Sequence, residues 1–134
     1  MSTKICYPAV FQKEESGYSV WIPDIPGCIS QGDDFEEAVN YITEAIGICL
    51  EDSLENGEKM PAPSSPDAIQ TEKGQFVSVV MFDPVEYQKK YSGKAIKKTL
   101  TIPAWLNTAS ERAHINFSQV LQEALMERLH ISNA

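Results

Sequence analysis

Polar side chains alternate with apolar ones near the carboxyl end of the chain, in a pattern suited to contacting nucleic-acid bases. In the segment 96–102 (IKKTLTI), Lys97, Thr99 and Thr101 share one face of an extended strand, because successive side chains point to opposite faces. Lysine and threonine can hydrogen-bond to base edges or contact a thymine methyl group in the major groove, which admits a two-stranded ribbon. The spacing therefore predicts a base-reading face, with an ordinary exposed strand face as the alternative.

Other residues near this strand could hold DNA phosphates. Lys98 falls on the inward face by parity, but its long side chain can reach out to a phosphate. Asn116 is a suitable helix N-cap, and the backbone amides of Asn116, Phe117 and Ser118 would form an anion-binding helix start. His114 and His130 have no His or Cys at ligand spacing, so we expect no metal site and no cofactor.

The elements that position these residues follow from Pro103 and the apolar spacing. Proline is unwelcome in a central strand but suits the first turn of a helix, so a helix is predicted over about 104–114 and a second one after Asn116. One strand and two helices of this size cannot enclose a core alone. We therefore expect an obligate dimer, with two strands paired and the helices enclosing Leu100, Ile102, Leu106, Val120, Leu121 and Leu125.

The amino-terminal part predicts a small α+β domain with the order β-β-β-α-β, a helix laid on a sheet. Pro8 argues for an edge position or a bulge in the first strand, and Asp34 with Glu37 forms a capping-box-like helix start. Pro84 and Gly93 indicate a linker over 83–94, which separates the predicted domains 1–82 and 95–134. Apolar spacing places the strands at 4–12, 18–22, about 28–32 and 76–82, and the helix at about 34–56.

The net charge of −8 divides unevenly along the chain. Residues 1–91 contain six lysines and sixteen carboxylates, whereas residues 92–134 contain five basic residues and three glutamates. An acidic surface repels phosphate and attracts basic proteins, although it can also serve solubility alone. Three widely spaced cysteines, the lack of a signal-peptide core and the lack of a long apolar run predict a soluble cytoplasmic protein.

A cluster of carboxylates leaves an enzymatic alternative open. Asp24, Asp33, Asp34 and Glu37 could belong to a metal-dependent nuclease, which needs several converging carboxylates. Helix capping already explains Asp34 and Glu37, so we expect no catalytic role. A repressor that senses a small ligand is a further alternative. Cys49 falls on the buried stripe of the predicted helix and is expected in the core rather than as a nucleophile.

Two regions resemble known families. Residues 96–131 resemble the ribbon-helix-helix repressors of the Arc/MetJ type, and YSVWIPDIPGCISQGDDFEEA at 18–38 resembles HicB-type antitoxins. The second resemblance implies a partial RNase H-like fold and a partner of the HicA type, a small basic ribonuclease with a double-stranded-RNA-binding fold. It also implies repression of the chain's own operon by a dimer or tetramer bound to operator DNA. By position, the ribbon residues of the family fall on Lys97, Thr99 and Thr101.

Three residues of the HicB-like stretch are candidates for binding the toxin. Tyr18 and Trp21 could serve as aromatic anchors, and Asp24 as an acidic neighbour suited to a basic interface. The alternative is that the two aromatic side chains belong to the core beneath the helix.

Overall fold

The chain divides into two units between Gly93 and Lys94. The computed structural model describes residues 4–131. Within the described residues, no helix combines the length and the apolar character needed to cross a bilayer.

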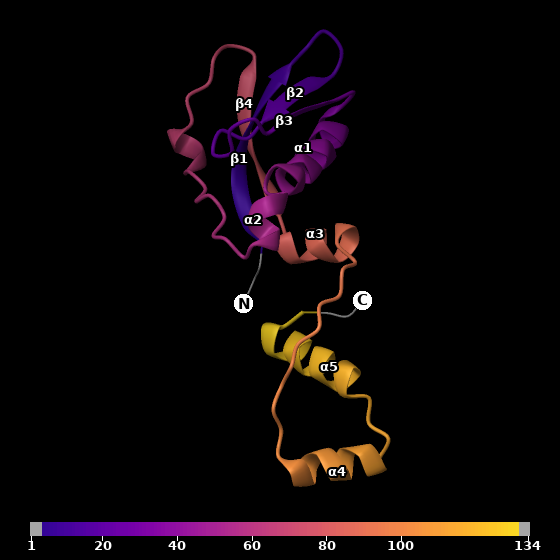
Figure 1. Cartoon of the computed structure of the whole chain (residues 1–134). Coiled ribbons are helices and arrows are strands. Elements are labelled where there is room, and N and C mark those ends of the chain that lie inside the picture. The colour runs from indigo at the N-terminus through magenta and orange to yellow at the C-terminus, as the bar shows by residue number, and fades with distance from the viewer. Residues whose placement is uncertain (1–3, 132–134) are drawn as a thin grey trace. The chain divides into compact units, whose positions relative to one another are not determined.

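The first unit contains a four-stranded antiparallel sheet in the order β3-β2-β1-β4 (Figure 1). In the register of this sheet, Phe11 of β1 lies opposite Val20 of β2 on one side and Phe76 of β4 on the other. The predicted α+β class and the order β-β-β-α-β are confirmed. The strands are β1 (Ile5–Lys13), β2 (Tyr18–Trp21), β3 (Ile29–Gly32) and β4 (Gln75–Phe82).

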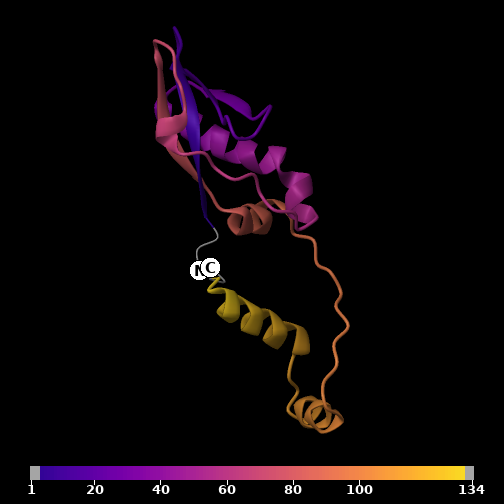
Figure 2. The same cartoon turned by 90° about the vertical axis from the view of Figure 1, so that its left-hand side faces the viewer.

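One face of this sheet is covered by helix α1 (Phe35–Cys49), and the core lies between them (Figure 2). Side chains alternate along a strand, so every second residue of β1 points toward the helix. The helix contributes the matching stripe at spacings of three and four residues. The core comprises Tyr7, Ala9, Phe11, Val20, Ile22, Ile25, Cys28, Ala38, Ile42, Ile46, Leu50, Val80 and Phe82.

Pro8 lies in the part of β1 that pairs with a neighbouring strand on one side only. β1 lies between β2 and β4, but β2 pairs only with residues 10–13. Pro8 lies opposite Val79 of β4, in the part of β1 that β2 does not reach. A proline lacks the N–H that a second neighbouring strand would require. The edge position predicted from Pro8 is therefore found in the first half of β1, where only β4 pairs with the strand.

Helix α1 begins as the sequence predicts and ends earlier. The Asp34 side chain accepts a hydrogen bond from the Glu37 N–H at 2.8 Å, and the Glu37 side chain accepts one from the Asp33 N–H at 3.2 Å. The helix predicted over 34–56 is divided at Leu50, whose ψ of 10° departs from helical geometry, and α2 (Glu51–Glu55) follows. The Leu50 side chain itself is buried in the core.

Residues 84–91 form helix α3 (Pro84–Tyr91), so the linker predicted over 83–94 is wrong for these residues. Asp83 is the N-cap and accepts hydrogen bonds from the N–H groups of Val85 and Glu86. Pro84 is the first helical residue, where its missing N–H costs nothing. The helix belongs to the first unit because the Tyr87 ring packs against Phe82, with centroids 5.8 Å apart.

The loop between α2 and β4 contains a short 3-10 helix, η1 (Pro66–Ala68). Two contacts hold this loop to the rest of the unit. The Tyr7 hydroxyl donates to the Pro61 carbonyl at 2.6 Å, and the Asp24 carboxylate accepts from the N–H and the hydroxyl of Ser64 at 2.9 and 2.5 Å. The turn after β2 is therefore tied to a segment 40 residues further along the chain.

The second unit contains two helices, α4 (Ala104–Arg112) and α5 (Phe117–Leu129), in agreement with the predicted pair. The strand expected over 96–102 is not formed in the single chain, since residues 92–103 carry no regular structure. A strand is defined by pairing with another strand. Within 94–131 there is also no buried residue, so this unit has no core of its own.

Candidate functional site

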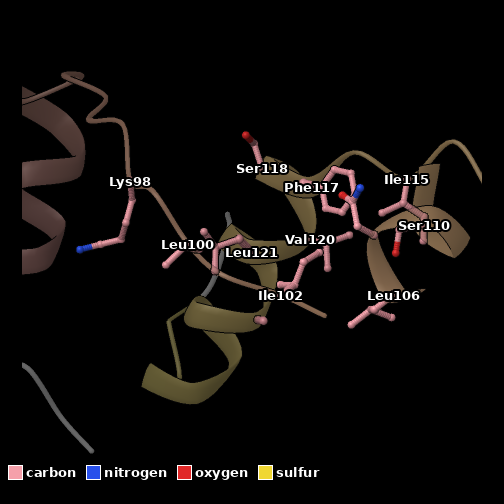
Figure 3. A pocket seen from close by; sticks show the side chains of 12 residues that line it. Lys98, Leu100, Ile102, Leu106, Ser110, Ile115, Phe117, Ser118, Val120 and Leu121 are labelled. Atoms are coloured by element: carbon pink, nitrogen blue, oxygen red, sulfur yellow. The ribbon is translucent and has the colours of Figure 1, made fainter. Parts of the chain in front are cut away.

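The second unit contains an apolar pocket of about 640 Å³ between its extended segment and its two helices (Figure 3). Its apolar lining side chains, among them Leu100, Ile102 and Val120, are substantially exposed in the single chain. Exposed apolar patches of this kind mark interaction surfaces. Of the six residues predicted for a dimer core, five line the pocket: Leu100, Ile102, Leu106, Val120 and Leu121.

The two faces expected for the segment 96–102 are separate in the structure. Lys98, Leu100 and Ile102 line the pocket (Figure 3). Lys97, Thr99 and Thr101 are exposed and stand outside the lining. The side chains of this segment thus alternate between two faces as they do in a strand, although no second strand pairs with it. It presents an apolar side toward the helices and a polar side away from the pocket.

The start of α5 has the predicted cap. The Asn116 side chain accepts a hydrogen bond from the Gln119 N–H at 3.1 Å. The Gln119 side chain does not return this bond but donates to Glu123 at 3.2 Å, so the reciprocal bond of a capping box is not formed. The N–H groups of Phe117 and Ser118 belong to the first helical turn, where the helix itself supplies no acceptor. An anion could therefore accept hydrogen bonds from these two N–H groups.

Two large apolar residues of this pocket were not predicted, and one predicted residue lies elsewhere. Ile115 and Phe117 both line the pocket. Ile115 precedes the N-cap and Val120 follows it by four residues, the spacing of a hydrophobic staple, which could have identified Ile115 from the sequence. Leu125 is 50% exposed and does not contribute to the lining.

The three residues predicted to bind the toxin do not form one surface in the first unit. Tyr18 is half-buried on the helix side of the sheet, with its ring edge-on to Phe35 at 6.0 Å and to Phe76 at 6.1 Å. Trp21, three residues further along β2, points to the opposite face and is also half-buried. The Asp24 carboxylate is engaged with Ser64. Each of the three therefore has a separate structural environment.

The carboxylates considered for a nuclease also have structural contacts. Asp34 caps α1, and Glu37 accepts from the Asp33 N–H. Over residues 4–131, no three His, Cys, Asp or Glu side chains gather in an arrangement that could hold a metal ion.

The cysteines are free thiols in two environments. Cys28 is buried in the core beside Cys49. Burial, together with the neighbouring Cys49 thiol, raises the pKa of Cys28 to about 12, so it is a neutral thiol at physiological pH. Cys49 itself is exposed, so its predicted place in the core is wrong. It is the last residue of α1, and the buried stripe of this helix continues through Leu50 rather than through Cys49.

The chain resembles one known family over most of its length. The family described as "HicB_like antitoxin of bacterial toxin-antitoxin system" matches residues 7–125. This range includes the sheet except for the first two residues of β1, all of α1 and every residue that lines the apolar pocket. The match is therefore not confined to one unit.

Individual relatives and solved structures agree with this match. An uncharacterized 14.9 kDa protein of the rep-hol intergenic region of Haemophilus phage HP1 is 36% identical over 102 residues, which is 75% of this chain and 74% of the relative. A chain of a toxin–antitoxin complex from Streptococcus pneumoniae is 31% identical with a TM-score of 0.56, over 93% of this chain and 99% of that chain. A chain of a HicA3 and HicB3 toxin–antitoxin complex is 26% identical with a TM-score of 0.51, over 60% of this chain and 100% of that chain.

Proposed function

This chain belongs to the HicB-like antitoxins of bacterial toxin–antitoxin systems, and on that premise we propose that it neutralises a HicA-like toxin and represses its own operon. The observation that carries the proposal is the family match over residues 7–125, across both units. The toxin of such a pair is a small basic ribonuclease, as the resemblance implies. We expect the chain to act by binding and to have no catalytic role of its own.

The charge of the first unit supports a basic partner. Residues 1–91 contain sixteen carboxylates against six lysines. Such a surface raises the rate at which a basic protein associates and disfavours nucleic acid. The order of its strands and helix is also the one expected for a partial RNase H-like domain. We therefore assign toxin binding to the unit that ends at Gly93.

Co-expression tests the antitoxin function. A HicA-like toxin induced alone is expected to arrest growth and to degrade messenger RNA, and co-expression of this chain is expected to restore both. A chain truncated after Gly93 is expected to retain part of this protection, because the sheet and its core lie entirely within that unit. Growth curves and transcript integrity measure both results. Growth arrest that the full chain cannot relieve would contradict the antitoxin assignment.

The second unit supports a DNA-binding dimer of the ribbon-helix-helix type. Its segment 96–102 keeps a polar face of Lys97, Thr99 and Thr101 apart from an apolar face of Leu100 and Ile102. A second copy of the chain would pair with this segment and cover the exposed apolar pocket. The polar faces of the two strands would then enter the major groove. Lys98 and the amides at the start of α5 would contact phosphates.

Substitutions on the polar face test the DNA assignment. Lys97→Ala, Thr99→Ala and Thr101→Ala are each expected to weaken operator binding by about tenfold, since a base contact contributes about 1–3 kcal/mol to discrimination. The dimer is expected to remain intact, because these side chains lie outside the apolar pocket. Band shifts and light scattering measure the two quantities. Lys59→Ala, an exposed lysine of the acidic unit, is the matched control and should bind operator DNA like the wild type.

A further inference from the structure

The negative charge of the first unit is concentrated in one continuous stretch of the chain. Residues 14–58 contain twelve Asp and Glu residues and no Lys, Arg or His. This stretch forms β2, β3, α1 and α2. All six lysines of residues 1–91 lie outside it. The elements formed by this stretch therefore carry a net negative charge, which attracts cations.

An apolar groove of about 370 Å³ lies within this acidic stretch, between β3 and α1. Three of its lining side chains are large, apolar and open to solvent: Ile29 is 67% exposed, Ile48 65% and Tyr41 47%. β3 is also an edge strand whose outer side pairs with no other strand among the described residues. An open strand edge beside exposed apolar side chains is a common place for an extended segment of a partner to bind.

A smaller acidic pocket of about 210 Å³ adjoins this groove, and Tyr41 lines both. Its lining residues include Glu14, Asp33 and Glu37, and none of them is basic. A lysine or arginine side chain entering this pocket would meet three carboxylates within reach. The groove and the pocket together offer an apolar site beside a cation site.

We propose that the basic toxin docks on this groove and pocket, with an apolar side chain between Ile29 and Ile48 and a lysine or arginine among Glu14, Asp33 and Glu37. Tyr41 would lie between the two contacts, as aromatic anchors commonly do at the centre of an interface. The proposal rests on the function proposed above and adds the place and chemistry of toxin binding. A second copy of this chain is a poor occupant, because it would bring two acidic stretches together.

Calorimetric titration of the full chain with a catalytically inactive HicA-like toxin tests this surface. Tyr41→Ala and Ile48→Lys are each expected to raise Kd about 30-fold, the effect of losing a hot-spot side chain. Both side chains are exposed, so the fold should tolerate the changes. Val79→Lys is the matched control for Ile48→Lys, since Val79 is an exposed apolar residue of β4, at the other edge of the sheet. It should change Kd by less than about twofold.

A second pair of variants tests the charge. Glu44→Gln, at the groove, is expected to raise Kd about threefold and to reduce its salt dependence. Glu72→Gln removes the same charge outside the acidic stretch and should leave Kd nearly unchanged. If Val79→Lys weakens binding as much as Ile48→Lys, or if neither Ile48→Lys nor Tyr41→Ala weakens it, this docking surface is wrong while the antitoxin function stands. If the wild-type chain does not bind the toxin, both proposals fail.

Discussion

Val120→Glu is expected to convert the chain into a monomer that no longer binds its operator. Val120 lines the apolar pocket of the second unit and is half-exposed in the single chain. In the proposed dimer the new carboxylate would be buried without a partner, which costs several kcal/mol. Operator affinity should therefore fall more than about 100-fold. Light scattering gives the mass of the particle, and band shifts give the affinity.

A matched control distinguishes this effect from a simple change of charge. Gln122→Glu adds the same charge two residues further along α5, at an exposed position outside the pocket lining. It should leave the dimer intact and reduce operator binding only slightly. Toxin neutralisation by Val120→Glu should persist, because the first unit has its own core. Loss of neutralisation together with dimerisation would indicate that toxin binding requires the dimer, and an unchanged dimer would contradict the proposed core.

The elements that the sequence predicts well are those with both a periodic apolar pattern and a local start signal. Helix α1 has the stripe of Ala38, Ile42 and Ile46 and the Asp34 cap, and its start is found correctly. The sequence at Pro84 predicts a linker, although a proline after a capping Asp also begins a helix. The segment 96–102 shows a different limit. Its alternation of apolar and polar residues predicts a strand, but a strand forms only when a second strand is present to pair with it.

The surface residues were harder to predict than the core. The prediction of Tyr18, Trp21 and Asp24 rests on residue type alone. The neighbours of Tyr18 and Asp24 come from distant parts of the chain, such as Phe76 and Ser64. By contrast, Tyr41 and Ile48 lie seven residues apart on α1, outside its buried stripe. Such a second apolar stripe on a helix is visible in the sequence. Its meaning becomes clear only when the structure places it beside the exposed Ile29.

The effect of Gly47→Ala on stability is expected to change sign with the residue at position 87. In the wild-type chain, a Cβ on Gly47 would overlap the ring of Tyr87, which is held between Phe82 and Tyr91. Overpacking of this kind should lower the free energy of unfolding by about 1–3 kcal/mol. In a Tyr87→Ala background the overlap is gone. Because alanine is the better helix former, Gly47→Ala should then raise the free energy of unfolding by about 1 kcal/mol.

Urea unfolding of the four variants measures this coupling. Trp21 reports on the first unit when Trp105, an exposed residue of the second unit, is replaced by phenylalanine. Gly47 is buried on α1, and Tyr87 is the only side chain among the nearest contacts of its added Cβ. A change of sign would therefore place α3 firmly on α1. The same gain in both backgrounds would mean that residues 84–91 do not pack there, and that the segment behaves as the linker expected from its sequence.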